Sequence, residues 1–534
     1  MDSALQTFID QQVAEFAPRL TRANGLQWLV ATTSRPEYEQ AWASEMLAIR
    51  RLAAEPARYH ILTRLMTETL DAPLLLARQA RLLHNFLRGN QIAPDLIDRI
   101  TEIETRVQST FNQFRATLAG RAVSDNDLRT VLRRSDDAAE RREAWEASKQ
   151  IGAQVAEDVR ELARLRNQAA RQAGFDNFYT MQLELDELDE QDLFSLFEAL
   201  KAGTDPLWQA YKTELDRTLA TRFGIDMEDV RPWHYADPFF QEGQPSEVNL
   251  DSYFADKNLE DLTRAYYSAI GMDVDDVLAR SDLYERPGKQ QHAFCIHIDR
   301  QGDVRVLCNN RPNEQWAGTM LHEFGHAVYD KYIDRDLPFL LRAPAHTLTT
   351  EAIAILGGNL IHDSAWLAHY AGVPFSEARR LEDSLQQAAR NAALIFARWV
   401  FVMSHFERAL YRDPEQDLNA LWWDMVEHFQ GVHRPDQRNA PDWAAKIHIA
   451  TAPVYYHNYL LGAMIAAQLL DHILAVVVNG SRERYVSDPR IGAYLIDRAF
   501  RPGSRHDWRG WLREVTGQDL SAAGYIRWLS GATA

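Results

Sequence analysis

The sequence predicts a mainly α-helical protein that contains one small β-element. Apolar side chains recur at every third or fourth position through residues 1–225, most clearly over 151–169, and this is the period of an amphipathic helix. The same spacing resumes from residue 347. Residues 292–298 and 304–308 have strand-like sequences on either side of a turn, which indicates a hairpin.

Residues 231–240 interrupt the helical pattern with prolines and aromatic residues that follow no period. These aromatic side chains fit ordinary packing better than the lining of a cleft. Because no linker-like change in composition divides the chain, we expect residues 1–534 to form one unit. We expect two approximate lobes within it, residues 1–240 and a second lobe at 241–534.

The composition narrows the classes of partner. The net charge is −18, and no basic stripe is available to neutralise a phosphate backbone, so we expect no nucleic-acid partner. The longest apolar run, residues 459–478, carries Gln468, Asp471 and His472 near its middle. We therefore interpret this run as a buried helix and expect no membrane partner.

Two further features predict a cytoplasmic protein. The first residues lack the basic and apolar regions of a secretory signal. The chain has two cysteines, Cys295 and Cys308, which form no disulfide framework and which we expect to be reduced. The sequence carries no signal for the oligomeric state.

Residues 322–326 read His-Glu-Phe-Gly-His within a helical pattern. Of all segments in the chain, this one gives the clearest indication of a chemical function. At 3.6 residues per turn, His322 and His326 lie one above the other on one face of the helix. Both imidazoles can therefore reach one zinc ion, at about 2.0–2.1 Å from each nitrogen. Glu323 is placed to act as a general base on a water at the metal rather than as a ligand. The motif predicts one zinc ion per chain.

Such a motif also arises by chance, in roughly one chain in twenty-five of this length and composition. Two neutral histidines on a buried helix face would give the same string, so a third ligand decides between the interpretations. Asp330 is too distant, because a position eight residues from His322 lies about 12 Å along the helix. Glu351 stands alone among small and apolar residues, where a carboxylate is costly to bury without a partner. We therefore predict His322, His326 and Glu351 as the zinc ligands.

Two other segments suit the same chemistry. The free edge of the expected hairpin could hydrogen-bond an extended peptide as an added strand, although a structural hairpin that caps the helices would have the same sequence. Residues 446–459 supply hydrogen-bond donors for the negative charge that develops on a scissile carbonyl, although tyrosines before an apolar helix often serve packing alone. The donors are His448, Tyr455, Tyr456 and Tyr459.

These residues resemble the gluzincin peptidases of the group that includes angiotensin-converting enzyme, thimet oligopeptidase and oligoendopeptidase F. The residues that carry the likeness are 322–326, 338–342, Glu351 and, more weakly, 145–149 and 165–167. The likeness is strongest over residues 285–462. It implies a large helical ellipsoid of two lobes with a deep central cleft, a small β-element beside the zinc helix, and short peptides as substrates.

The resemblance also implies substrate-binding roles. His292 and Ala293 match the strand of converting enzyme that binds the substrate backbone. Lys446 and Tyr455 match the pair that holds the C-terminal carboxylate of the substrate. His448 matches a histidine that contacts the substrate near the scissile bond.

Two positions depart from the pattern of the family. The spacing of converting enzyme places the tyrosine that stabilises the transition state at Asn458, whereas alignment through Tyr-x-x-Tyr-Leu places it at Tyr459. We choose Tyr459, with Tyr456 beside it. The acidic residue that orients a zinc histidine in converting enzyme is replaced by Ile355, so we expect Asp330 or a backbone carbonyl to take over this role.

We therefore interpret the chain as a zinc-dependent peptidase of short peptides. If Lys446 and Tyr455 capture a free carboxylate, dipeptides are released from C-termini, as a peptidyl-dipeptidase would do. An endo-acting oligopeptidase is the alternative within the class. A non-catalytic helical peptide-binding protein with a structural zinc is a third reading, and Glu323 argues against it because a structural site has no use for a base beside its ligands.

Overall fold

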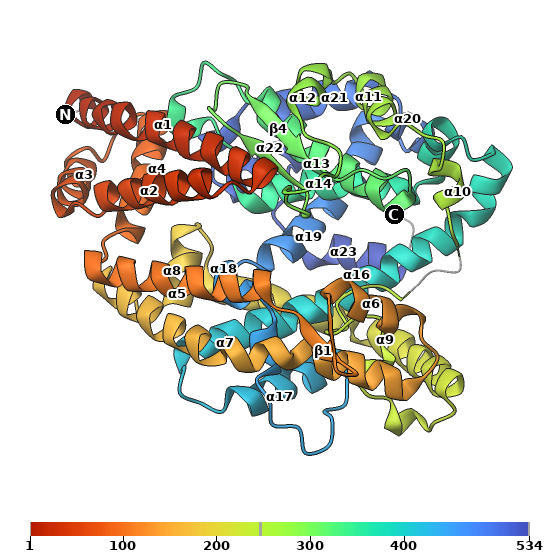
Figure 1. Ribbon diagram of the computed structural model, residues 1–534. Coiled ribbons are helices and arrows are strands. Elements are labelled where there is room, and N and C mark those ends of the chain that lie inside the picture. Colours follow the sequence, from red (N-terminus) through yellow and green to blue (C-terminus); the bar gives the residue numbers. More distant parts are fainter. Residues whose placement is uncertain (1, 245–247, 532–534) are drawn as a thin grey trace.

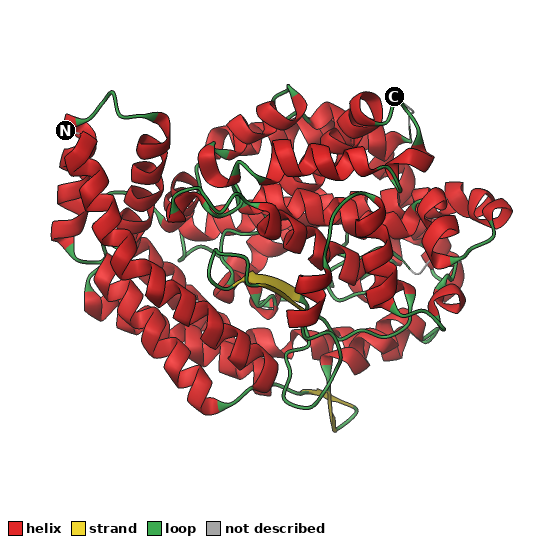
Figure 2. Ribbon diagram, turned by 90° about the horizontal axis from the view of Figure 1, so that it is seen from above, coloured by secondary structure: helices red, strands yellow, loops and turns green. Residues whose placement is uncertain are grey.

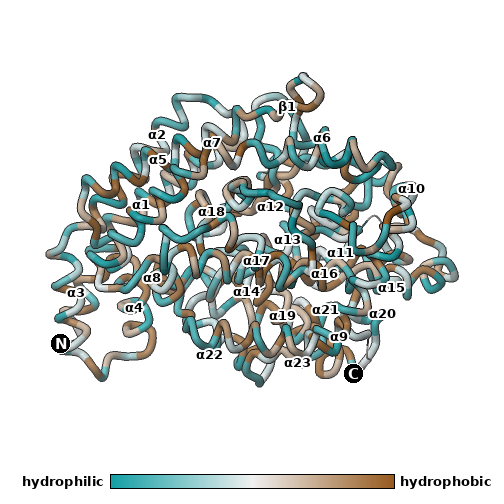
Figure 3. The backbone as a smooth tube through the Cα atoms, turned by 90° about the horizontal axis from the view of Figure 1, so that it is seen from below, coloured by the Kyte–Doolittle hydropathy of each residue, from teal (hydrophilic) through white to brown (hydrophobic). Residues whose placement is uncertain are grey.

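The computed structural model describes residues 2–244 and 248–531. Within these residues the fold is mainly helical and contains two antiparallel two-stranded sheets (Figure 1, Figure 2). This confirms the predicted mainly α-helical class and the predicted hairpin, whereas the second sheet, at residues 116–123, was not predicted from the sequence. Hydrophobic and hydrophilic residues alternate along the helices in Figure 3, as expected for helices that bury one face.

The first four helices form a unit at one end of the molecule (Figure 1). Their bounds are α1 (Asp2–Thr33), α2 (Pro36–Ala53), α3 (Pro56–Glu68) and α4 (Leu74–Gly89). The unit buries a core of its own, which includes Ile9 and Phe16. Asn24 Nδ2 of α1 donates hydrogen bonds to the carbonyls of His297 and Ile298, at 3.2 and 3.1 Å. The unit therefore lies against the segment that was predicted to form the hairpin.

A second group of helices combines segments that are far apart in the sequence (Figure 1). It contains α5 (Pro94–Gln113), β1 (Ala116–Leu118), β2 (Arg121–Val123), α6 (Asp125–Arg134), α7 (Ala138–Gln172), α8 (Phe178–Leu185), α9 (Glu190–Phe223), α16 (Phe375–Arg412) and α17 (Leu418–Gln430). α7 packs against α5, against α16 and against the 3₁₀ turn η6 (Asp442–Ala445). One large core extends from Leu96 to Leu529, so packing is continuous across residue 240.

The remaining elements include α13 and α14, which carry the predicted ligands. They are α10 (Asp251–Phe254), α11 (Leu259–Ala269), α12 (Asp275–Arg280), β3 (Phe294–His297), β4 (Val304–Leu307), α13 (Glu314–Tyr332), α14 (Thr347–Gly358), α15 (Ser364–Trp366), α18 (His448–Thr451), α19 (His457–His472), α20 (Arg482–Tyr485), α21 (Pro489–Leu495), α22 (Trp508–Thr516) and α23 (Ala522–Ser530). In the predicted hairpin, Phe294 of β3 pairs with Leu307 of β4. β4 also forms a parallel bridge to Asp282, whereas no described residue pairs with the other edge of β3.

Glycines stand where the helices of the site cross. A Cβ at Gly325 of α13 would lie 2.6 Å from Ala354 Cα of α14. A Cβ at Gly462 of α19 would lie 2.9 Å from the Cβ of Glu351, again on α14. Ordinary contact between carbon atoms is about 3.5–4.0 Å, so any larger residue would push these helices apart. The two glycines therefore set the spacing of the helices that carry the predicted ligands.

The irregular segment 231–240 packs in the core, as predicted. The rings of Tyr235 and Phe240 stack with their centroids 4.2 Å apart, and Phe239 lies 5.3 Å from Trp399 in the same measure. Its aromatic side chains therefore serve packing.

The long apolar run forms α19 and a π-helical turn, η7 (Ile473–Val477). By length and composition alone, residues His457–Val477 could cross a membrane. In the structure α19 packs against α14 and α23 and brings Tyr459 to the predicted metal ligands. This arrangement agrees with a core helix.

Candidate metal centre and active site

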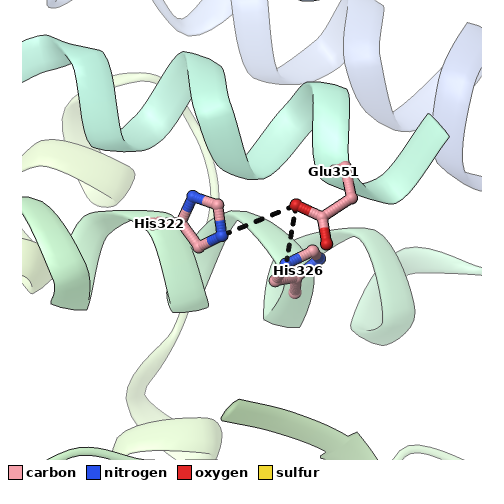
Figure 4. A group of neighbouring side chains, drawn as sticks. All are labelled: His322, His326 and Glu351. Carbon is pink, nitrogen blue, oxygen red and sulfur yellow. Dashed lines mark ion pairs between the residues drawn. The ribbon is translucent and has the colours of Figure 1, made fainter. Parts of the chain in front are cut away.

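Two helices bring the three predicted ligands together, as Figure 4 shows. α13 presents His322 and His326 one turn apart, and α14 presents Glu351 toward both of them. The Nε2 atoms of the two histidines lie 3.8 and 3.9 Å from Glu351 Oε2. Among the described residues these three side chains form a group whose ligand atoms lie within 4.8 Å of one another, close enough to hold one metal ion.

The residues present fit a zinc ion. Two ligands that are each about 2.0–2.2 Å from a tetrahedral zinc lie about 3.4 Å apart, close to the observed separations. Glu351 Oε2 is buried and has no hydrogen-bond partner among the residues that the structure describes. A buried carboxylate oxygen is costly without a partner, and a cation between the three side chains would supply one.

Neighbouring groups orient both histidines. His326 Nδ1 lies 2.7 Å from Thr350 Oγ1, and the His322 ring hydrogen-bonds to the backbone of Ala354. A partner on one ring nitrogen fixes the tautomer and leaves the other nitrogen for the metal. The Nε2 atoms of both rings are the ones that face Glu351.

Asp330, the other candidate for this orienting role, lies elsewhere. Its carboxylate is 3.9 Å from His297 Nδ1, and burial raises its pKa to about 7 while the nearby Arg300 opposes the rise. The backbone, which was the second alternative, therefore replaces the acidic side chain that is missing at position 355.

Burial determines the protonation states of the three predicted ligands and of Glu323. Burial lowers the pKa of His322 to about 4 and, together with the neighbouring His322, that of His326 to about 3. Both imidazoles are therefore neutral near pH 7, which is the form that binds a metal. Burial and the Glu351 carboxylate raise the pKa of Glu323 to about 8, and burial raises the pKa of Glu351 to about 7. A bound cation would lower both values, because it favours the charged carboxylates.

Two cavities meet at the ligand group, where His322 and Glu351 border both of them and His326 borders the larger one. The larger has a volume of about 840 Å³, and Glu323 and Ala293 are among the residues that line it. The smaller, of about 510 Å³, lies between α14, α16 and α19. His322, Glu351 and Tyr459 line both cavities. A peptide laid across the ligands would therefore extend into a cavity on each side.

The two tyrosines predicted to stabilise a transition state occupy different environments. Tyr459 lines both cavities. Burial and the carboxylates of Glu351 and Glu323 raise the pKa of Tyr459 to about 12, so its hydroxyl stays protonated and can donate. Tyr456 is only 4% exposed, and its ring centroid lies 6.0 Å from that of Trp399. Tyr459 therefore faces the cavities, and Tyr456 packs in the core.

Lys446 and Tyr455, the predicted carboxylate-binding pair, each have a partner in the structure. Lys446 Nζ donates to Gln241 Oε1 at 2.8 Å, and the Tyr455 hydroxyl donates to Glu351 Oε1 at 3.3 Å. Gln241 lines the smaller cavity, whereas Tyr455 lines the larger one. The two side chains thus lie on different sides of the ligand group.

The remaining predicted residues are Ala293, His292 and His448, and they lie in different surroundings. Ala293 lines the larger cavity, just before β3. His292 is exposed. Burial lowers the pKa of His448 to about 4, helped by the charges of Lys446 and His292, so His448 is neutral near pH 7. The His448 ring lies 5.1 Å from the ring of Tyr456, measured between centroids.

The N-terminal half holds the site in place, which gives a physical reason for the weaker likeness noted there. Lys149 Nζ and Trp145 Nε1 both donate to the carbonyl of Pro238, at 2.8 and 3.0 Å. These bonds fix the loop just before Gln241, which accepts the hydrogen bond from Lys446. Arg166 Nη1 donates to the carbonyl of Ile449 at 3.3 Å, directly after the predicted histidine.

Sequence reasoning missed four residues that build the site: Thr350, Gln241, Gly325 and Gly462. A threonine in a helix of small residues and a glutamine in an irregular loop carry no signal of their own. The glycines did carry one. A glycine inside a helix costs about 0.5–1 kcal/mol relative to alanine, so its presence within the motif and within an apolar helix indicates close packing.

Comparison with models of known protein families shows which families resemble this chain. A model described as peptidase family M3 matches residues 278–528, which contain all three ligands, and a model described as angiotensin-converting enzyme matches residues 2–232. The chain is thus similar to the M3 and M2 gluzincin peptidases, and the His322, His326 and Glu351 group lies in its M3-like half. The resemblance inferred from the sequence is thereby confirmed.

Three curated proteins that the chain matches are each 25% identical to it or less. Carboxypeptidase 1 of Bacillus subtilis is 24% identical over 313 residues, which cover 54% of this chain and 60% of that protein. An inactive angiotensin-converting enzyme-related protein of Caenorhabditis elegans is 21% identical over 382 residues, 62% of this chain and 41% of that protein. Thermostable carboxypeptidase 1 of Pyrococcus furiosus is 25% identical over 230 residues, 39% of this chain and 46% of that protein. The chain thus spans about half the length of the relatives that it matches.

Proposed function

We propose that the protein is a zinc-dependent peptidase that hydrolyses short peptides and binds one zinc ion per chain. The observation that carries this proposal is the convergence of His322, His326 and Glu351 on one point, with Glu323 beside them and a cavity on each side. A catalytic zinc has three protein ligands and leaves a position for water, whereas a structural zinc has four ligands and no use for a neighbouring base.

When bound, zinc would act as a Lewis acid that activates a water molecule and polarises the scissile carbonyl. Glu323 accepts a proton from the attacking water and passes it to the leaving amine. The Tyr459 hydroxyl donates to the negatively charged oxygen of the tetrahedral intermediate, and His448 acts as a second donor. The free edge of β3, with His292 and Ala293 before it, binds the substrate backbone as an added strand.

We propose in addition that the enzyme releases dipeptides from free C-termini. Lys446, with its partner Gln241, would hold the terminal carboxylate through a charge-assisted hydrogen bond. Tyr455 lines the other cavity and would not share in this contact. The names of two relatives, both carboxypeptidases, support cleavage from this end. An endo-acting oligopeptidase is the alternative, in which the substrate continues past the smaller cavity. Within this proposal the two cavities belong to one deep cleft between two lobes, and the enzyme acts in the cytoplasm.

Glu323→Gln tests the chemistry. The variant should bind zinc as the wild type does and lose peptide hydrolysis by about 10³-fold, because the general base is removed while the ligands stay. Glu314→Gln, at the start of the same helix, is the control and should remain active. Zinc content by mass spectrometry and hydrolysis of a labelled peptide give the two readouts. Full activity in Glu323→Gln would contradict the mechanism.

The mode of cleavage needs a separate test. One nonapeptide with a free C-terminus and the same peptide with an amidated C-terminus are digested in parallel, and the products are identified by mass spectrometry. Release of a dipeptide from the free form alone is the expected result. Equal cleavage of both forms would reject carboxylate capture and favour the endo-acting alternative.

A further inference from the structure

The smaller cavity is walled by alanines from two helices. Ala389, Ala392 and Ala393 lie on α16, and Ala463, Ala466 and Ala467 lie on α19. Each set has the i, i+3, i+4 spacing that places side chains on one face of a helix. Since each side chain is a single methyl group, the two faces leave open the cavity of about 510 Å³ between them. We refer to this space as the alanine pocket.

The alanine pocket opens directly on the predicted metal ligands. His322 and Glu351 form part of its wall, and Tyr459 stands at the same end. The pocket is therefore adjacent to the bond that the proposed reaction would break. Gln241, which accepts a hydrogen bond from Lys446, lines the pocket as well. If Lys446 holds a terminal carboxylate, the pocket lies on the carboxyl side of the scissile bond.

The pocket offers a substrate no unpaired charge beyond the ligand group. Among its described lining residues, three further acidic side chains each have a cationic partner from outside or from the wall. The pairs are Glu242 with Arg129 at 2.8 Å, Asp363 with Arg482 at 3.5 Å, and Asp471 with Arg527 at 3.3 Å. Aromatic rings complete the wall, including those of Phe396, Tyr525 and Trp528. A wall of methyl groups and rings favours an apolar occupant.

We propose that the alanine pocket is a specificity pocket for a large aromatic side chain of the substrate, on the carboxyl side of the scissile bond. This proposal rests on the proposed peptidase function. A cavity of about 150 Å³ lined by apolar side chains already holds a benzene molecule, so the alanine pocket has room for any natural aromatic side chain. One methylene in such a pocket changes kcat/KM by about 10–200-fold. A substrate with Phe in the pocket should therefore exceed one with Ala by about 100-fold or more.

The test uses peptides that differ at one position. In a series with a free C-terminus, Phe replaces Ala in turn at each of the two positions on either side of the cleaved bond, and kcat/KM is measured with zinc-loaded enzyme. Ala389→Leu places a larger side chain in the pocket, and Ala388→Leu places the same side chain at the neighbouring position, which does not line the pocket. We expect Ala389→Leu to reduce kcat/KM for the preferred Phe peptide at least tenfold and to leave the Ala peptide within threefold. Ala388→Leu should leave both unchanged.

The outcomes separate this proposal from the proposed function. If wild-type enzyme cleaves no peptide, the peptidase function itself fails. If it cleaves Phe and Ala peptides equally, or prefers Phe only on the amino side, the peptidase stands and the pocket assignment is overturned. An equal loss for both peptides in Ala389→Leu would also overturn it. Ala467→Leu, which fills the same pocket from α19, repeats the test should Ala389→Leu fail to fold.

Discussion

Replacing Gly325 by alanine tests whether the close crossing of α13 and α14 creates the metal site. The added Cβ would lie 2.6 Å from Ala354 Cα and 2.9 Å from the carbonyl oxygen of Ile353. Because carbon atoms in contact lie about 3.5–4.0 Å apart, α14 must move away by about 1 Å. Overpacking of this kind costs about 1–3 kcal/mol, and the gain in helix propensity returns about 0.5–1 kcal/mol. We expect a net loss of about 1–2 kcal/mol in the free energy of unfolding.

The same movement of α14 would also change the affinity for zinc. Glu351 lies on α14 one turn before Ala354, so its carboxylate moves with the helix. The separations of 3.8 and 3.9 Å from the two histidines would grow further beyond the distance that a tetrahedral zinc requires. We expect zinc affinity to fall by about 10–100-fold, the range found when a group that orients a ligand is lost.

Gly25→Ala is the matched control. Gly25 also lies inside a helix, α1, and a Cβ there would meet no atom within 4 Å. This variant should bind zinc normally and gain about 0.5–1 kcal/mol of stability. Thermal unfolding and zinc competition against a coloured chelator measure both variants. Wild-type zinc affinity and unchanged thermal stability in Gly325→Ala would refute the reasoning, as would an equal loss of zinc in Gly25→Ala.

Two other perturbations probe the site, and a third probes a buried carboxylate of the core, Glu407. Thr350→Val removes the partner of His326 Nδ1 and should lower zinc affinity by about tenfold in the same competition assay; unchanged affinity would deny the orienting role. Tyr459→Phe should lower kcat by about 10²–10³-fold with KM and zinc content unchanged, whereas Tyr456→Phe should have little effect on kcat; the reverse pattern would assign the oxyanion to Tyr456. Burial raises the pKa of Glu407 to about 8. Since the folded pKa lies above the unfolded one, Glu407 adds stability below about pH 4.5, and this contribution is lost as pH rises to about 8, by up to about 4–5 kcal/mol. Urea unfolding at several pH values should show this fall in the wild type and a smaller slope in Glu407→Gln; identical slopes would place the pH dependence elsewhere.

The sequence predicted those features that depend on a local period of apolar residues or on a residue whose burial is costly without a partner. The spacing of apolar side chains identified the helices, and the alternation at residues 292–308 identified the hairpin. Glu351 could be selected because an isolated carboxylate in an apolar helix needs a partner, and the structure places it beside both histidines. Asp330 could be rejected because distance along a helix follows from residue number.

Features that depend on tertiary packing could not be predicted. Tyr456 and Tyr459 have similar sequence contexts. Tyr456 packs on Trp399 and Tyr459 lines the cavities because of how α19 is oriented against its neighbours, which the sequence does not reveal. Gln241 meets Lys446 across 205 positions of sequence, in a loop without periodicity. The joining of α16 and α17 to helices of the N-terminal half is likewise a property of the whole core.

Zinc binding by the purified chain tests the central claim most directly. Metal content and affinity are measured for the wild type, for Glu351→Gln and for Asp330→Asn, which changes a buried carboxylate on the zinc helix that is not a ligand. We expect one zinc ion per chain in the wild type and in Asp330→Asn, and a loss of affinity of about 100-fold in Glu351→Gln. Zinc bound as tightly by Glu351→Gln as by the wild type would contradict the three-ligand site on which the account rests.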